Sequence, residues 1–195
     1  MAARLPAPRR RRQLLDVALD VFGELGYHQA SMDVVAEAAG VTKPVLYQHF
    51  GSKRDLYLEL LGDVGNQLLE AVVKATAGAS HPRAQVEAGF EAYYRFVESH
   101  VNAFRLLFGG GLGTDAEFAA VVSRVEDTMA ETIATLIEAD LEPEHRRLLA
   151  YGVVGLAETT SRHWVNGGLN LDAVTLAARV ADLAWAGLRA VHRDY

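Results

Sequence analysis

The chain has 195 residues, of which half are hydrophobic and none is cysteine, and its net charge is −6. This length suits one domain of ordinary size or a small module joined to a larger one, and the apolar content excludes disorder as the main state. The lack of cysteine excludes disulfides, thiolate catalysis and cysteine-based zinc sites.

Charge is distributed unevenly along the chain. Residues 1–54 contain eight Lys and Arg against five Asp and Glu, a net charge of +3. Residues 55–195 contain eleven against twenty, a net charge of −9. A basic N-terminal part on an acidic body can meet a polyanion with that part first, so the overall charge does not exclude a nucleic-acid partner.

No segment predicts a membrane span or a secretory leader. The longest nearly apolar run, residues 148–157, has ten residues, whereas a spanning helix needs roughly 18 or more. The basic N-terminus lacks the apolar stretch of a leader because Asp16, Asp20 and Glu24 interrupt it. We therefore expect a cytoplasmic protein with no membrane partner.

Apolar residues recur at helical spacing along almost the whole chain, for example over residues 14–25 and 174–188. No convincing strand alternation is present, so the predicted fold class is all-α. Glycines at 26, 40 and 51 cut the N-terminal part into short pieces. Four further breaks follow, at residues 78–82, 109–115, 139–143 and 166–170. We expect three short helices, a fourth over residues 53–77 and about five more, about nine in all.

Residues 30–53, ASMDVVAEAAGVTKPVLYQHFGSK, have the pattern of two short helices joined by a tight turn. Ser31 can cap the first helix, expected from residue 32 to about 39. Gly40 permits the backbone of a turn, and Thr42 can cap the second helix with Pro44 in its first turn. Two helices joined by three or four residues that include Gly form a helix-turn-helix.

The second of these helices carries more polar chemistry than folding requires. Val45 and Leu46 can face the core, which leaves an outward set of Thr42, Lys43, Tyr47, Gln48 and His49. In a major groove, Gln and Thr can bond to base edges, Val or Pro can contact a thymine methyl group, and Lys, Tyr and His can bond to phosphates. Ser52 then opens the next helix with Asp55 three residues on, and Lys53 beside its first amides offers another phosphate site.

These assignments have alternatives. Tyr47 could be a surface aromatic over the fourth helix, and His49 could pack beside Phe50. The arginines at 9–12 could form a solvated terminus, or they could contact phosphate or the minor groove. Met32, Val35 and Leu46 are interpreted as core.

Residues 11–56, RRQLLDVALDVFGELGYHQASMDVVAEAAGVTKPVLYQHFGSKRDL, resemble the DNA-binding head of the tetracycline-repressor (TetR) family of bacterial regulators. The likeness is without a gap and covers about a quarter of the chain. It runs through Phe22, Gly26, Tyr27, Ser31, Val35, Ala36, Ala39, Gly40, Val41, Thr42, Leu46, Tyr47, His49, Phe50, Ser52 and Lys53.

The resemblance implies a helix-turn-helix DNA-binding domain over residues 1–54 and a helical effector-binding and dimerisation domain over residues 55–195. It implies a transcriptional regulator, expected to be a repressor, that binds a palindromic operator as a homodimer and is released by a small, mostly apolar effector. The expected DNA-binding residues are Ser31, Thr42, Lys43, Pro44, Val45, Tyr47, Gln48, His49 and Lys53.

Dimerisation is expected through the last two helices, over residues 143–165 and 171–192. Both carry apolar residues on broad faces with small residues interspersed, and a helix that is apolar over so much of its circumference is usually buried on two sides. The resemblance implies a four-helix bundle contributed by two subunits. A monomeric helical core is the alternative.

An effector pocket is expected in the middle of the chain, where residues 92–111 contain five aromatic side chains. The candidate lining residues are Tyr93, Tyr94, Phe96, Phe104, Arg105, Phe108, Glu158, His163 and Trp164. Aromatic residues at helical spacing are also typical of an ordinary core, and that alternative stays open.

An enzyme is not expected. The sequence has no nucleophile elbow, and the glycines at 109–113 lack the Lys-Ser/Thr of a phosphate loop. His100, His145 and His163 lack the partners of a metal site, although Glu158 lies five residues before His163, so no cofactor or metal is expected. A helical protein that binds a small molecule or a partner and no longer reads DNA is the alternative function.

Overall fold

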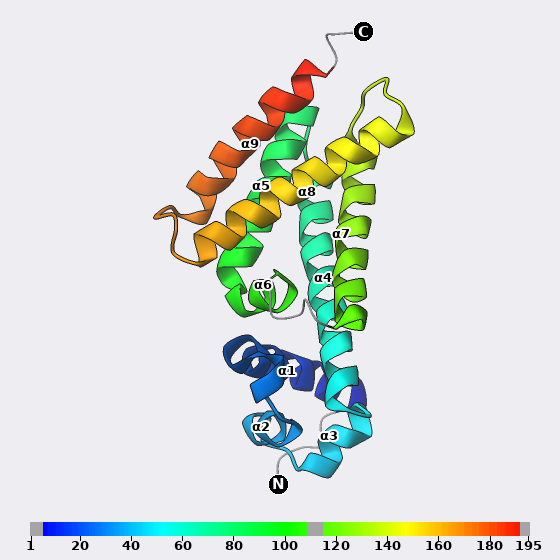
Figure 1. Cartoon of the computed structure of the whole chain (residues 1–195), viewed down its shortest axis with the longest axis vertical. Coiled ribbons are helices and arrows are strands. Elements are labelled where there is room, and N and C mark those ends of the chain that lie inside the picture. The colour runs from blue at the N-terminus through cyan, green and yellow to red at the C-terminus, as the bar shows by residue number, and fades with distance from the viewer. Residues whose placement is uncertain (1–5, 109–114, 192–195) are drawn as a thin grey trace. The chain divides into compact units, whose positions relative to one another are not determined.

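The structure, a computed structural model, describes residues 6–108 and 115–191. All regular elements within these residues are α-helices, which confirms the predicted fold class (Figure 1). Nine helices follow one another in this part of the chain: α1 (Ala7–Gln29), α2 (Met32–Ala38), α3 (Lys43–His49), α4 (Lys53–Ala77), α5 (Pro82–Ser99), α6 (Val101–Phe108), α7 (Ala116–Leu136), α8 (Pro143–Val165) and α9 (Ala173–Ala190).

Two helix boundaries differ from the expected ones for local reasons. The aromatic segment beyond residue 82 forms two helices because His100 leaves helical geometry, with φ −135° and ψ 52°. The second of them, α6, has only eight residues. Helix α9 begins at Ala173 because the side chain of Asp172 accepts the N–H of Thr175 at 2.9 Å and caps it. Most of the expected break at residues 109–115 and the expected end of the last helix at residue 192 lie outside the described residues.

Contacts divide the chain into two compact units. Unit 1 comprises the described parts of Met1–Val64 and Asn102–Val121, and unit 2 those of Gly65–Val101 and Val122–Tyr195. Helices α4 and α7 each continue from unit 1 into unit 2. The functional division after residue 54 stays a prediction, since compact units and functional domains need not coincide.

Unit 1 is built on the buried face of α1. Leu14 and Ala18 of this helix are fully buried, as are Leu46 of α3 and Leu56 of α4. The helix breaks at Gly26, whose φ of 74° and ψ of 163° lie in a region that residues with a side chain rarely adopt. This break confirms that Gly26 ends the first regular helical segment.

Helices α1 and α6 of unit 1 approach closely at Gly23. A Cβ atom added there would overlap the side chain of Asn102 and lie 3.0 Å from its Cα. The Asn102 amide also donates to Asp20 at 3.5 Å. Gly23 is therefore the residue that permits this crossing.

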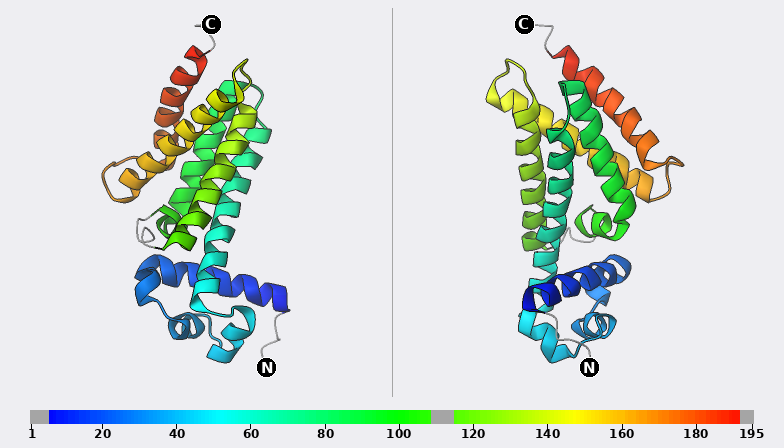
Figure 2. Two further views of the ribbon diagram at one scale, coloured as in Figure 1. Left: turned by 45° about the vertical axis from the view of Figure 1, so that its right-hand side comes forward. Right: turned by 180° about the vertical axis from the view of Figure 1, so that it is seen from behind.

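Unit 2 consists of α5, α8, α9 and the continuations of α4 and α7. Helices α5 and α9 lie side by side and α8 packs against both (Figure 2). The buried residues of α9 are mostly small, and those of α5 are mostly aromatic: Phe90, Tyr93, Tyr94 and Val97. Within unit 2, α4 and α7 meet at Gly65, where an added Cβ would overlap the side chain of Val125. No described helix is both long enough and apolar enough to cross a membrane.

We predict that Gly23→Ala lowers the free energy of unfolding, because the new methyl group forces α1 and α6 apart. Overpacking of this kind costs about 1–3 kcal/mol, and urea titration followed by circular dichroism measures it. Gly62→Ala is the matched control, since this α4 glycine has open space around it and Ala gains about 1 kcal/mol over Gly within a helix. A Gly23→Ala variant as stable as the wild type would contradict the close α1–α6 crossing.

Candidate nucleic-acid interface

Helices α2 and α3 form the predicted helix-turn-helix in unit 1. The hydroxyl of Ser31 accepts the N–H of Val34 at 3.2 Å, which confirms the predicted cap of α2. Gly40 has a φ of 63°, and the N–H groups of Gly40 and Val41 donate to the carbonyls of Glu37 and Ala36, each at 3.0 Å. These paired bonds around a left-handed glycine end a helix sharply, so α3 starts at Lys43 in a new direction.

The predicted cap of α3 is only partly correct. Thr42 occupies the capping position, and its carbonyl accepts the N–H groups of Val45 and Leu46 at 2.9 and 3.2 Å. Its hydroxyl, however, makes no capping hydrogen bond, and the residue is exposed. The Thr42 hydroxyl therefore keeps its hydrogen-bonding capacity for another partner.

One face of α3 is anchored and the opposite face is open. Leu46 is fully buried, and Phe50, directly after the helix, is 2% exposed. Lys43, Pro44, Tyr47 and Gln48 are exposed. Positions 43 and 47, and 44 and 48, are four residues apart, so these side chains share the face that Leu46 does not occupy.

The remaining predicted contact residues are half-buried. Val45 lies between the two faces, as expected for a residue that can serve the core and the surface. The ring centroids of His49 and Phe50 lie 6.4 Å apart. The backbone carbonyl of His49 accepts a hydrogen bond from Arg11. Ser31 and Lys53 are also half-buried.

Lys43 is held by an acidic neighbour on α2. Its ammonium group lies 2.9 Å from the carboxylate of Asp33, and this hydrogen bond raises the pKa of Lys43. Both side chains are at least half exposed. The carboxylate therefore competes with any anion that approaches the start of α3.

Lys53, in the first turn of α4, is oriented by an aromatic ring. Its ammonium lies 4.4 Å from the Tyr27 ring centroid and 3.4 Å from the carbonyl oxygen of His28. Burial lowers the pKa of this ammonium, and contact with a ring face favours its charged form. Ser52 caps the same helix by accepting the N–H of Asp55 at 3.0 Å, as predicted.

The arginines at 9–12 have different surroundings. Arg11 pairs with Glu59 of α4 and lies 4.4 Å from the centroid of the Phe50 ring. Arg12 pairs with Asp16 at 2.6 Å and with Asp63 at 2.7 Å. These two residues tie α1 to α4, a role that was not predicted from the sequence. Arg9 is exposed.

Sequence reasoning also missed the aromatic cluster that joins α1, α4 and α7, made of Phe22, Tyr27, Tyr57 and Phe118. Tyr57 lies 5.0 Å from Phe22, 4.7 Å from Tyr27 and 4.9 Å from Phe118, between ring centroids. Burial raises the pKa of Tyr57 to about 12. Phe118 is distant in sequence, so no local pattern pointed to its contact with the head.

The nine residues expected to line an effector pocket are distributed over both units. Phe104, Arg105 and Phe108 belong to α6 in unit 1, and Arg105 is exposed. The other six lie on α5 and α8 in unit 2. Their contact with one another as a single pocket stays a prediction.

Within unit 2, the layer between α5 and α8 contains buried hydroxyl groups. The hydroxyls of Tyr94 and Thr160 lie 2.6 Å apart. Those of Tyr93 and Ser161 are fully buried and lie near one another, but neither makes a hydrogen bond of good geometry with any residue of 6–108 and 115–191. Burial raises the pKa of the Tyr93 phenol. Buried hydroxyls that lack a well-formed hydrogen bond are costly, so these two groups are candidates to meet a bound polar atom.

The other polar candidates on α8 have separate partners. Glu158 pairs with Arg162 one turn away and not with His163, which corrects the suggested meeting of Glu158 and His163. The His163 ring lies against Gly168, where an added Cβ would overlap it. Trp164 donates to the Leu171 carbonyl at 2.8 Å. No group of three or more His, Asp or Glu in the described residues is placed to hold a metal ion.

Two family models match the chain. Residues 14–60 match the bacterial regulatory proteins of the tetR family, and residues 82–187 match the tetracyclin repressor-like C-terminal domain. The chain belongs to the TetR family of transcriptional regulators. The first match covers the helix-turn-helix, so this TetR-family protein contains a DNA-binding domain.

Individual proteins agree with this assignment. The chain is 36% identical to the HTH-type transcriptional activator FasR of Mycolicibacterium smegmatis over 95% of this chain and 85% of FasR. A TetR-like transcriptional regulator from Rhodococcus sp. RHA1 has a similar crystal structure, with a TM-score of 0.78 and 32% identity over 95% of this chain and 99% of that one.

A more distant structure shares the fold. The transcriptional regulator FadR from Bacillus subtilis, crystallised with stearoyl-CoA, has a TM-score of 0.76 and 19% identity over 90% of this chain and 98% of FadR. All three proteins are named as transcriptional regulators or activators.

We predict that Asp33→Asn strengthens binding to a mixed-sequence DNA duplex several-fold, because it removes a negative charge beside Lys43 and releases the ammonium. Fluorescence anisotropy at low and moderate salt measures the gain, which should shrink as salt screens the charges. Glu24→Gln, the same charge change at an exposed site on α1, should have a smaller effect. Weaker binding by Asp33→Asn would mean that the carboxylate orients Lys43 for DNA.

Proposed function

We propose that this TetR-family protein is a homodimeric regulator that binds a two-fold-symmetric operator through α3 and responds to a small effector bound in unit 2. The observation that carries the proposal is the open face of α3, which is rich in hydrogen-bonding groups, opposite the buried anchor Leu46. An exposed helix of this composition suits a major groove. Because the operator of a bacterial regulator lies in the cytoplasm, we place the protein there.

Base contacts are assigned to the start and middle of α3. The Gln48 amide can pair with adenine, the free Thr42 hydroxyl can bond to a base edge, and Pro44 and Val45 can contact a thymine methyl group. Lys43 can reach a base or a phosphate once it leaves Asp33.

Phosphate contacts are assigned around the base contacts. Tyr47 is 43% exposed and its phenol can donate to a phosphate oxygen. Lys53 presents an oriented ammonium at a helix N-terminus, where anions are favoured. Ser31 and His49 complete the proposed set, with His49 at the end of α3.

The dimer is proposed to form through α8 and α9, with a second copy of the chain as the partner. Leu148 of α8 and Leu183 of α9 are 67% and 62% exposed in the single chain. Gly152, Gly155 and Gly187 on these helices have no atom within 4 Å of an added Cβ. Large apolar residues next to open glycines suit a close helix–helix contact.

The sign of regulation depends on where the operator lies relative to a promoter. The proposal from sequence is repression, whereas FasR is named an activator. A dimer that occupies the operator represses when its site overlaps that of RNA polymerase, so we retain repression with effector release as the proposed mode. The effector must then bind the DNA-free state more tightly than the bound state.

The effector is proposed to be mostly apolar with one group that forms hydrogen bonds. The aromatic residues of α5 suit an apolar part, and the buried hydroxyls of Tyr93 and Ser161, which lack a well-formed hydrogen bond, suit a polar atom. Stearoyl-CoA, the molecule bound to FadR, is a first probe because its acyl chain matches the apolar part and its thioester carbonyl can accept a hydrogen bond. Its phosphate-bearing coenzyme A group is not part of the proposed match, so stearic acid is tested beside it.

We predict that the purified protein enriches a two-fold-symmetric site from a random DNA pool, as read by selection and sequencing. Tyr47→Ala and Lys53→Ala should each weaken binding to that site about tenfold, since a charged or polar phosphate contact is lost. Leu183→Glu should prevent dimerisation, so the DNA sites that this variant enriches should no longer be two-fold symmetric.

Two control variants separate these effects from general damage. Lys74→Ala removes the same charge from the far end of α4, and Leu25→Glu places the same carboxylate on an exposed position of α1. Both should retain the site. Folded wild-type protein that enriches no sequence at low salt would overturn the DNA-binding proposal and favour a helical ligand-binding or partner-binding protein.

We predict that stearoyl-CoA raises the thermal unfolding temperature of the wild type and that Tyr93→Phe reduces the rise. The phenol hydroxyl that would meet the ligand is removed, while the ring that packs against α8 remains. Differential scanning fluorimetry measures the shift, with Tyr151→Phe on α8 as a matched control. A rise that is equal in wild type and Tyr93→Phe would contradict the proposed position of the polar group.

A further inference from the structure

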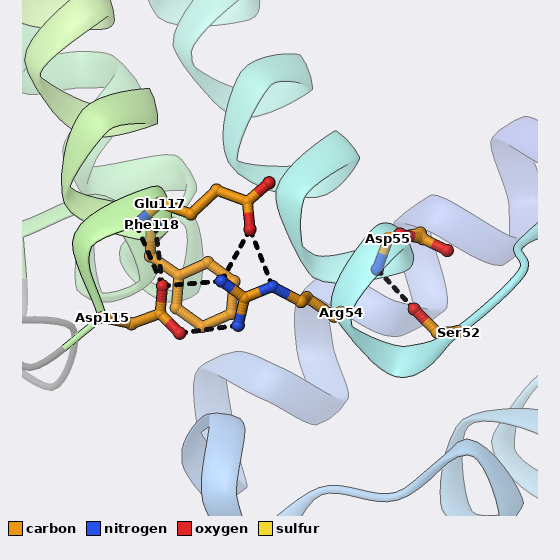
Figure 3. A network of polar contacts seen from close by, with 6 residues as sticks. All are labelled: Ser52, Arg54, Asp55, Asp115, Glu117 and Phe118. Atoms are coloured by element: carbon orange, nitrogen blue, oxygen red, sulfur yellow. Dashed lines mark hydrogen bonds and ion pairs between the residues drawn. The ribbon is translucent and has the colours of Figure 1, made fainter.

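Arg54 joins the first turns of α4 and α7 within unit 1 (Figure 3). Its two terminal nitrogens lie 2.6 and 2.8 Å from the two carboxylate oxygens of Asp115. Its Nε donates to Glu117 at 2.8 Å, and its guanidinium carbon lies 4.8 Å from the Phe118 ring centroid. A paired contact with one carboxylate, a second carboxylate and a ring face together fix the plane of the guanidinium.

Asp115 serves both helices of this junction. One of its oxygens accepts the N–H groups of Glu117 and Phe118 at 3.0 and 3.3 Å, which caps α7. The hydrogen bond from Arg54 is the main reason that the pKa of Asp115 falls to about 2. The carboxylate therefore stays ionised wherever DNA binding is measured, and the pair weakens only as pH falls from about 4 toward 2.

The position of Arg54 in the sequence suggests a phosphate contact, but its partners argue against one. It follows Lys53 in the first turn of α4, where anions are favoured. Its three guanidinium nitrogens are, however, all bonded to carboxylates, and two negative charges oppose its single positive charge. A phosphate would have to displace a bidentate pair to reach it.

We propose that Arg54 is a positioning residue for DNA binding. It fixes the first turn of α4 against α7, so that this turn does not shift when the ammonium of Lys53 contacts a phosphate. This inference rests on the proposed contact of Lys53 with DNA. Ser52 caps the same turn, so Arg54 and Ser52 hold it from opposite sides of Lys53 in the sequence.

The experiment measures affinity for the duplex that wild-type protein enriches most strongly, at fixed salt, for Arg54→Lys, Asp115→Asn, Lys53→Ala and the double variant Arg54→Lys/Lys53→Ala. Lys keeps the charge but cannot bridge two carboxylates. Asn retains the ability to cap α7. Glu24→Gln controls for the loss of one negative charge.

Arg54→Lys and Asp115→Asn should each weaken DNA binding. The expected loss is about tenfold, which corresponds to the loss of one charge-assisted pair between α4 and α7. The affinity of the double variant should be about that of whichever single variant, Arg54→Lys or Lys53→Ala, binds DNA more weakly. The reason is that Arg54 acts through Lys53, so the two losses of binding free energy are not additive. Thermal unfolding and the fraction of active protein, measured by stoichiometric titration, separate this outcome from a loss of folded protein.

Tighter binding by Asp115→Asn would overturn the proposal, since it would mean that Arg54 is a phosphate contact that Asp115 restrains. The proposal would also be overturned if the fold-losses in affinity of the two single variants multiplied in the double variant. Such a result is expected when two contacts act independently, because their binding free energies then add. So would an unchanged affinity of the active fraction in all Arg54 and Asp115 variants. If wild-type protein enriches no duplex, the proposed DNA function fails first and this inference fails with it.

Discussion

Burial of four aromatic rings in unit 1 is the interaction on which the placement of α3 depends. Phe22 and Tyr27 come from either side of the break at Gly26, Tyr57 from α4 and Phe118 from α7. Such pairs contribute about 0.5–1.5 kcal/mol each beyond the burial of their area. Helix α3 is joined to α4 by only three residues, so the rings that fix the start of α4 also limit where α3 can lie.

Five cations of residues 9–54 are already held by other groups of the chain in the absence of DNA. Arg11, Arg12, Lys43 and Arg54 are all paired with carboxylates, and Lys53 lies over a ring. The net positive charge of residues 1–54 thus overstates the charge that is free to attract phosphates. Affinity will depend on which pairs DNA can open, and the more exposed pairs are the easier ones to open.

Local patterns were sufficient to predict much of the head. The caps at Ser31 and Ser52, the left-handed Gly40 and the limits of α4 follow from rules that act over a few residues. Thr42 shows the limit of such rules, since a residue at a capping position need not use its side chain to cap.

Contacts between distant residues were outside the reach of sequence patterns. Nothing near Arg54 indicates Asp115 as its partner, and nothing near Gly23 indicates Asn102. The assignment of aromatic residues was also ambiguous, because Tyr93 and Tyr94 are buried as a core would require, yet only the Tyr94 hydroxyl makes a hydrogen bond of good geometry. Burial alone cannot distinguish packing from a ligand site.

The interleaving of the two units along the chain has a consequence for biosynthesis. A ribosome that has made residues 1–60 has made every proposed DNA contact, but Phe118 follows only about sixty residues later, after roughly 3–12 seconds of synthesis. During that interval the rings of Tyr27 and Tyr57 lack the neighbour that covers them in the complete chain. The smallest gene fragment that encodes all the proposed DNA contacts is therefore shorter than the smallest fragment that also encodes the complete aromatic cluster, which includes Phe118.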